Sequence, residues 1–431
     1  MQGRSYLTAH WNALTLHETV NGTAQANGIS LRPRATTAAP TSSVIHRPMI
    51  GPDHRRHRIS PALPFGRARF LRNEPSGRPL NIGIFIPLSG AAGIWGPSCH
   101  RCADLAVHEI NANGGVGGRP ITMSVVDAGR SPEEVATAAE IMLRDGNIDA
   151  LIGMHISAVR VALVAAIQSR IPYIYTPLYE GGETATGVYP IGETPNQQVR
   201  PAVLWFSKTF GTRRWALIGN DYIWPHVSHR AAHRYIGEIG GCVADDHFVP
   251  LGQEDHDSSI RRIEASKPDA VMVSLVGQDL VHFNRQFVAR GLDKSIKRFC
   301  PALEENVLLA LIPDAGEELY TSGAYFGSLR SAPNISFSTQ YLRRFSNTAP
   351  VLNRFSALCY EGVRLYAEMV RTAGSTQFSA LADIAEGLTF DGPRGRRQLV
   401  GNHVSTPIFI AKVEDQMLKT IHGIPNQSPG R

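Results

Sequence analysis

Few residue patterns in this chain have the spacing that catalysis or metal binding requires. Cys99 and Cys102 form a C-x-x-C pair near the start of an expected helix. A helix N-terminus can lower a thiol pKa there, as in redox proteins, although both residues could instead pack the helix. His226, His229 and His233 are spaced i, i+3 and i+7, which favours a solvated helix face over the alternative of a metal site. No P-loop and no G-x-S-x-G elbow occurs, so we expect no enzyme, no metal and no cofactor.

The glycine-rich run GGVGGRP also lacks the context that a nucleotide site needs. Its glycines follow the expected helix and end it. In the dinucleotide fingerprint, the glycines follow a strand and begin a helix. The run therefore predicts a helix terminus and a turn.

The positive charge of the chain is confined to its N-terminal part. The net charge is +6 at pH 7, yet residues 1–79 contain eleven Arg and three acidic residues, while the remainder has 32 basic and 34 acidic residues. A nucleic-acid-binding fold carries its charge on the folded face, so no direct contact with nucleic acid is expected. Residues 1–78 lack a regular period and predict a disordered basic extension, in which HRRHR could also bind phosphate.

The sequence gives no sign of a membrane segment or an export signal. The first 22 residues, MQGRSYLTAHWNALTLHETVNG, lack an apolar run of about 7–15 residues. No run of about 18 apolar residues follows, so no membrane span is expected. The five cysteines form no evident disulfide framework. We expect a cytoplasmic protein, or an extracytoplasmic one if translation starts elsewhere.

From Pro79 onward, short apolar segments alternate with segments of helical period. PLNIGIFIPL predicts a buried strand, and the helix after it should end at Gly114 and Gly115. Ser131 before Pro132 predicts a helix N-cap. The alternation predicts an α/β fold with parallel sheets that are covered on both faces. It is too long for one sheet, so we expect two lobes.

The loops at the carboxyl ends of the strands should hold the ligand. Ser157 follows the strand ALIGMHI and precedes a helix, where a hydroxyl and exposed backbone N–H groups suit a carbonyl or carboxylate oxygen. A plain N-cap is the alternative. Tyr175 and Thr176 end the next strand.

Eight strings in these loops, taken in order, resemble one protein family. They are PLSGAAGIWGPS, EINANGGVGGRPI, LIGMHISAVR, YTPLYEGGE, LIGNDYIWP, VPLG, SLVGQD and YEG. They are similar to type I periplasmic binding proteins, in the branch of branched-chain amino acid, urea and short-chain amide receptors. Within that branch they look most like AmiC-type amide-sensing regulators of amidase and nitrile hydratase genes. The resemblance covers about Pro79 to Lys412.

The resemblance implies two Rossmann-like parallel-sheet lobes joined by a three-stranded hinge. The first lobe would comprise residues 79–197 and 329–390, the second lobe residues 198–328 and 391–420, and residues 421–431 would be a tail. The chain would cross between the lobes near Asn196–Pro201, Phe326–Arg330 and Phe390–Pro393. The ligand would lie in the cleft, and closure would be a hinge motion.

The resemblance also implies which residues bind the ligand. Ser157 matches the family's binding serine, and His155 stands where amide sensors tend to have a tyrosine, unless it is simply a buried core histidine. Tyr222 and Trp224 would bury a short apolar tail, although core aromatics would look the same. Gly277 and Glu304 would complete the second-lobe wall, and Trp95 would cover the mouth. The full set is Trp95, His155, Ser157, Tyr175, Thr176, Tyr222, Trp224, Gly277 and Glu304.

The charge of the ligand stays open at this point. An amino acid would need a carboxylate for its ammonium group, and Asp221, Asp279 and Glu304 are all candidates. A short amide or urea would need none.

Two functions follow. The first is a sensor of small amides or related polar molecules that regulates an amide- or nitrile-degrading pathway through a partner protein. The second is a substrate-binding protein of an ABC importer for amides, urea or branched-chain amino acids, with a permease as its partner. A homo-oligomer is compatible with both.

Overall fold

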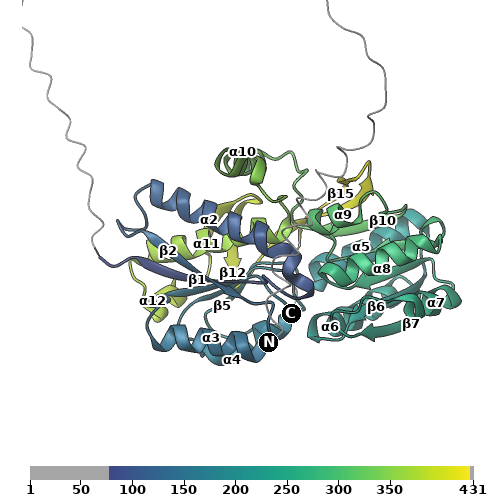
Figure 1. The fold of residues 1–431 in the computed structure, drawn as a ribbon, viewed down its shortest axis with the longest axis horizontal. Coiled ribbons are helices and arrows are strands. Elements are labelled where there is room, and N and C mark those ends of the chain that lie inside the picture. The colour runs from purple at the N-terminus through teal and green to yellow at the C-terminus, as the bar shows by residue number, and fades with distance from the viewer. Residues whose placement is uncertain (1–76, 428–431) are drawn as a thin grey trace, which may run out of the picture. The chain divides into compact units, whose positions relative to one another are not determined.

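The computed structural model describes residues 77–427, which form two large β-sheets flanked by helices (Figure 1). The predicted α/β fold with two parallel-sheet lobes is therefore confirmed. The predicted basic extension lies outside the described residues apart from Gly77 and Arg78. Within the described part of the chain, no helix has the length and apolar character to cross a membrane.

The first lobe is built on a five-stranded parallel sheet in the order β2-β1-β3-β4-β5. Its strands are β1 (Leu80–Ile86), β2 (Ile121–Asp127), β3 (Ala150–Gly153), β4 (Tyr173–Tyr175) and β5 (Val188–Pro190). The central strands are buried on both faces, which explains their continuously apolar sequences.

Helices lie on both faces of this sheet (Figure 1). Those packed together on one face are α2 (Gly96–Ala112) and α11 (Arg354–Ala373), and those on the other are α3 (Pro132–Arg144) and α4 (Ser157–Ile167). The first lobe also contains α10 (Ala332–Phe345) and α12 (Phe378–Asp383), as well as the 3-10 turns η2 (Ala91–Trp95) and η4 (Ser346–Thr348). Ser131 caps α3 as predicted, because its hydroxyl accepts from the Glu134 N–H at 3.3 Å.

The second lobe is built on a seven-stranded sheet in the order β15-β14-β10-β9-β8-β6-β7. The parallel strands are β6 (Arg214–Asn220), β7 (Cys242–Val249), β8 (Ala270–Ser274), β9 (Lys297–Phe299) and β10 (Leu319–Gly323). The helices are α5 (Pro195–Phe210), α6 (Ile223–Glu238), α7 (Asp257–Ser266), α8 (Gly277–Ala289), α9 (Glu305–Leu311) and the turn η3 (Leu292–Lys294).

Two antiparallel strands complete this sheet: β14 (Thr406–Glu414) and β15 (Met417–Gln427). The turn between them is Asp415-Gln416, and both residues have positive φ, 49° and 61°. Such a two-residue turn suits the twist of a hairpin, but its usual signature contains glycine. The sequence analysis therefore missed the hairpin, and the predicted tail from residue 421 is a strand as far as Gln427.

The chain passes between the lobes three times. It passes between β5 and α5, between β10 and α10, and between Val404 and Thr406. The third passage lies later than the expected Phe390–Pro393. The reason is a small antiparallel sheet of β11 (Thr389–Gly392), β12 (Gly395–Val400) and β13 (His403–Val404), which packs against α11 and β5 and so belongs to the first lobe.

Buried polar side chains form hydrogen bonds next to the segments that connect the lobes. Arg354, at the start of α11, donates to the carbonyl oxygens of Pro301 and Ser322, both at 2.7 Å. Gln198 of α5 donates to the same two oxygens, at 2.8 and 2.5 Å. Buried carbonyl groups need donors, so the two side chains satisfy them jointly and fix α5 and α11 relative to the second sheet.

One contact between the lobes leaves no room for a side chain. Gly277, at the start of α8 in the second lobe, has a φ of +52°. A Cβ atom added there would lie 1.9 Å from the carbonyl oxygen of Ala91 in η2 of the first lobe. Glycine is needed both for the backbone conformation and for the close approach.

Replacing Gly277 with alanine should push the lobes apart, because the methyl group would overlap the Ala91 oxygen. We expect the Gly277→Ala protein to have a larger radius of gyration than the wild type in small-angle X-ray scattering. The matched control is Gly291→Ala, at the other end of α8, where φ is also positive but no atom lies within 4 Å of the added Cβ. Equal radii for all three proteins would contradict the role given to Gly277.

Candidate functional site

A small cavity lies between the lobes, at the carboxyl ends of the strands. It encloses about 30 Å³, room for roughly two water molecules. Its lining residues are Trp95, Met154, His155, Ile156, Ser157, Tyr175, Pro177, Leu178, Tyr222, Trp224, Val276, Ala302 and Phe355. Six of the predicted site residues are among them. Entry of an organic solute requires the lobes to separate or these side chains to move.

Hydroxyl groups and a helix N-terminus form the first-lobe wall. Ser157 begins α4, and its Oγ lies 3.4 Å from the Tyr175 hydroxyl, which donates to the His155 carbonyl at 2.8 Å. The first backbone hydrogen bonds of α4 are donated by Val159 and Arg160 to the Ile156 carbonyl. The two N–H groups before them therefore have no acceptor within the helix and suit a ligand oxygen.

His155 is a neutral, well-satisfied side chain of this wall. Its Nε2 lies 3.0 Å from the Tyr173 hydroxyl, and its Nδ1 lies 3.1 Å from the Ile156 carbonyl oxygen. Burial lowers the pKa of His155 to about 3, with a smaller opposing effect of the Ile156 carbonyl and a further lowering by Arg160. The ring therefore presents no positive charge to the cavity at neutral pH.

Behind this wall lies a cluster of one arginine and two glutamates. Arg160 pairs with Glu180 at 2.6 Å and also with Glu183. Its guanidinium carbon lies 5.7 Å from the ring centre of Tyr175 and 5.5 Å from that of Tyr179. Glu180 thus holds a buried ion pair.

Aromatic side chains form the second-lobe wall. Tyr222 is the N-cap residue of α6, and its ring centre lies 6.3 Å from that of Trp224. Burial raises the pKa of the Tyr222 phenol well above its ordinary value, so the hydroxyl stays protonated. Neither this hydroxyl nor the Trp224 indole N–H forms a hydrogen bond within residues 77–427. Both donors are therefore available to a ligand.

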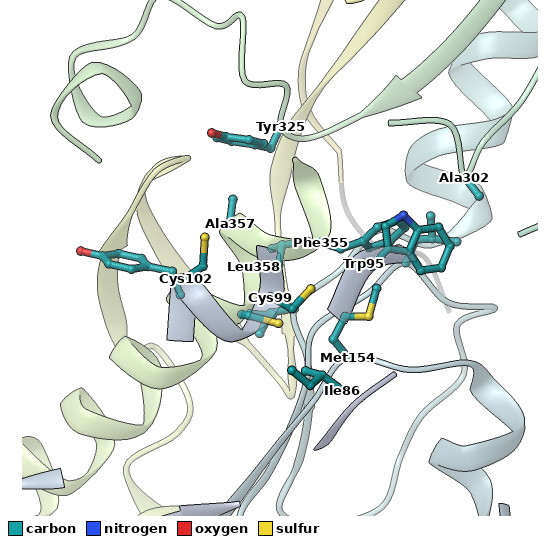
Figure 2. Close-up of a cluster of buried hydrophobic side chains, with 14 of the residues drawn as sticks. Ile86, Trp95, Cys99, Cys102, Met154, Ala302, Tyr325, Phe355, Ala357 and Leu358 are labelled. Atoms are coloured by element: carbon teal, nitrogen blue, oxygen red, sulfur yellow. The ribbon is translucent and has the colours of Figure 1, made fainter. Parts of the chain in front are cut away.

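Trp95 and Phe355 cover the cavity from the side of η2 and α11. Their ring centres lie 4.5 Å apart, and Figure 2 shows them beside Met154. The Trp95 indole N–H donates to Glu304 Oε1 at 2.7 Å. Because Glu304 precedes α9 of the second lobe, this bond joins the two lobes at the cavity.

Three predicted residues do not line the cavity. Thr176 is buried, and its hydroxyl faces the Gly153 carbonyl at 3.3 Å and the Cys359 sulfur at 3.7 Å. Gly277 lies beneath the Ala91 carbonyl, as described above. The Glu304 carboxylate is turned toward Trp95 and the start of α9.

The sequence analysis missed several lining residues. Met154, Ile156, Pro177 and Leu178 adjoin predicted ones, so position relative to the strand ends could have identified them. Phe355 comes from α11, about 180 residues after the first-lobe strands, and no local signal marks it.

A larger hollow lies elsewhere, between α2, α10, α11 and β11, and measures about 750 Å³. It contains none of the predicted residues, and some of its polar groups bind one another. The Tyr360 hydroxyl donates to Glu109 at 2.5 Å, and Arg364 donates to the Asp391 carbonyl at 2.9 Å. The smaller cavity is the better candidate site, because it lies at the carboxyl ends of strands and is lined by residues of both lobes.

The two other constellations in the sequence are structural. Cys99 and Cys102 are buried, and burial raises the pKa of both thiols, which is the opposite of redox activation. His229 and His233 both pair with Asp246, at 2.7 and 2.8 Å. Across residues 77–427, no group of three or more His, Cys, Asp or Glu side chains is placed to hold a metal ion.

Comparison with known proteins identifies the fold and the family. A Leu/Ile/Val-binding protein of Rhizobium johnstonii is 26% identical over 198 residues, which are 44% of this chain and only 53% of that relative. A solute-binding protein of an ABC transporter from R. palustris, solved with 4-hydroxybenzoate, has a TM-score of 0.72 at 19% identity and covers 82% of this chain and 98% of its own.

A branched-chain amino acid transporter substrate-binding protein of Streptococcus pneumoniae, solved with isoleucine, also has a TM-score of 0.72, at 18% identity, and covers 81% of this chain and 100% of its own. The family profile described as periplasmic binding protein matches residues 79–417. That match spans most of the chain and both lobes as far as the start of β15. The chain belongs to the periplasmic binding protein family.

Proposed function

We propose that the chain is a substrate-binding protein that captures a small organic solute between its lobes and delivers it to an ABC permease. The observation that carries the proposal is the cavity itself, where side chains of both lobes meet. A solute that contacts Ser157 and Tyr222 together stabilises the closed arrangement, since only differential affinity can shift the equilibrium between open and closed forms. Delivery to a permease also favours the extracytoplasmic location.

The lining indicates the shape of the solute. Trp95, Tyr175, Tyr222, Trp224 and Phe355 supply aromatic surface for an apolar or aromatic body. Hydroxyl and N–H groups at two sides supply donors for an oxygen-bearing end. Two of the similar proteins were solved with 4-hydroxybenzoate and with isoleucine, and both of these solutes have an apolar or aromatic body and an oxygen-bearing end.

Amide sensing through a regulatory partner, which the sequence favoured, has less support than uptake. The similar proteins described above are solute-binding proteins of transporters, and no feature of the cavity requires an amide. The uptake alternative is therefore our proposal.

Titration calorimetry with 4-hydroxybenzoate, isoleucine, butyramide and urea should find a binding solute. With the tightest of these, Ser157→Ala should weaken binding by about three- to tenfold, as expected for one neutral hydrogen bond. Tyr222→Ala should weaken it further, because aromatic contact area is lost as well. The control is Tyr360→Phe, in the larger hollow, which should bind as the wild type does. The reverse pattern would place the site in that hollow.

Affinity for that solute should change less than about twofold between pH 5.5 and 8. The pKa of His155 is about 3, and burial raises the pKa values of Tyr175 and Tyr222, so none of the three titrates in this range. Because the folded-state pKa of His155 lies below the unfolded value, protonation should instead lower the free energy of unfolding as the pH falls below about 6.5. An affinity that changes near pH 6.5 in the wild type but not in His155→Gln would contradict the predicted pH independence of binding.

A further inference from the structure

Whether the solute carries an amino group depends on the carboxylates near the cavity. A buried ammonium group needs an anionic partner, because an uncompensated charge is strongly destabilising out of water. The sequence offers Asp221, Asp279 and Glu304 for this purpose, and the structure adds Glu180 and Glu305.

Glu304 binds the cavity residue Trp95, and its carboxylate accepts three hydrogen bonds from the protein. Oε1 accepts from the Trp95 indole at 2.7 Å and from the Val307 N–H at 2.9 Å. Oε2 accepts from the Asn306 N–H at 2.8 Å. The side chain is completely buried, so these donors come from the protein alone. An ammonium group that approached Oε1 would have to compete with the Trp95 indole N–H.

The two aspartates, Asp279 and Asp221, also have partners within the protein. Asp279 is buried, and its Oδ2 accepts from the Asn220 amide at 2.6 Å and the Gly252 N–H at 2.8 Å. Asp221 is largely exposed and pairs with His226 at 2.7 Å. Neither residue lines the cavity.

The remaining two carboxyl groups, of Glu180 and Glu305, are not part of the cavity lining. Glu305 accepts from the Gly327 N–H at 2.6 Å, and burial raises its pKa to about 8, so it is mainly neutral at pH 7. Glu180 shares Arg160 with Glu183, and its Oε2 is buried without a hydrogen bond. Glu180 is therefore the strongest rival partner for an ammonium group, and the experiment must include it.

The groups that the cavity does offer are donors or neutral hydroxyls. They are the Tyr222 hydroxyl, the Trp224 indole N–H, the Ser157 hydroxyl and the first N–H groups of α4. Such groups suit the oxygen atoms of a carboxylate or a carboxamide. They cannot neutralise a cation.

Given the proposed solute-binding function, we propose that the Trp95–Glu304 hydrogen bond makes this site selective for carboxylates or carboxamides that lack an amino group. Glu304 is then a specificity-determining residue that holds Trp95 in place and does not contact the solute. This selectivity is the opposite of that of an amino acid receptor, although both would share the fold.

The test compares solutes that differ only in the α-ammonium group. The pairs are L-phenylalanine with 3-phenylpropanoate, and L-isoleucine with 3-methylpentanoate, titrated calorimetrically into the full-length protein; the amide 3-phenylpropanamide distinguishes a carboxamide from a carboxylate preference. We expect the amine-free member to bind at least about tenfold more tightly than the amino acid, because the ammonium group lacks a partner. Equal or tighter binding of the amino acids would overturn the proposal.

Variants separate the role of Glu304 from that of its neighbours. Glu304→Gln keeps an acceptor for Trp95, so the affinities for both members of a pair should change by the same factor. The same result is expected for Glu180→Gln. Trp95→Phe frees Glu304 Oε1, and the preference for the amine-free member should fall at least about tenfold. The matched control is Phe355→Leu, which removes aromatic area beside Trp95 and should leave the preference unchanged.

The outcomes distinguish the two proposals. Selective loss of amino acid binding in Glu304→Gln or Glu180→Gln would overturn the selectivity mechanism and leave solute binding intact. If no member of either pair and no solute of the earlier panel binds, the proposed function itself fails, and the selectivity with it. Circular dichroism and melting temperature confirm that each variant is folded.

Discussion

The hydrogen bond between the Trp95 indole and the Glu304 carboxylate determines the shape of the cavity and its charge. It holds an aromatic ring over the cavity and joins the two lobes, while the same carboxylate caps α9 by accepting from the Asn306 and Val307 N–H groups. Its geometry depends on η2 reaching α8, which requires that position 277 be glycine. A larger residue there would move Trp95 away from Glu304. The proposed selectivity among solutes and the contact between the lobes therefore depend on the same few residues.

The charged side chains near the cavity lie outside its lining and pair with one another. Arg160 lies behind Tyr175 and Tyr179 and binds two glutamates, while burial keeps His155 neutral. Buried charges are costly unless they are paired, so the ion pairs can stand close to a solute without attracting one. What remains in the cavity is aromatic surface and hydrogen-bond donors. Selection among solutes then depends on shape and on where their oxygen atoms lie.

The sequence predicted the fold because strand and helix periods alternate without interruption. Ser157, Tyr175 and Tyr222, which were predicted because they follow strands, line the cavity between the lobes. The sequence could not predict the orientation of individual side chains. Glu304 has a suitable position and type, yet its carboxylate faces Trp95, from 209 residues away in the chain. The β14–β15 hairpin was missed because its turn lacks glycine, and the third passage was misplaced because β11–β13 pack locally against α11.

The account is tested most directly by a crystal structure of the protein with the tightest-binding amine-free solute. It predicts that the solute lies between Ser157 and Tyr222, with an oxygen atom at the start of α4, and that the Trp95–Glu304 hydrogen bond is retained. A solute in the hollow between α2, α10 and α11, or an amino group of a bound solute in contact with Glu304 in place of Trp95, would contradict it.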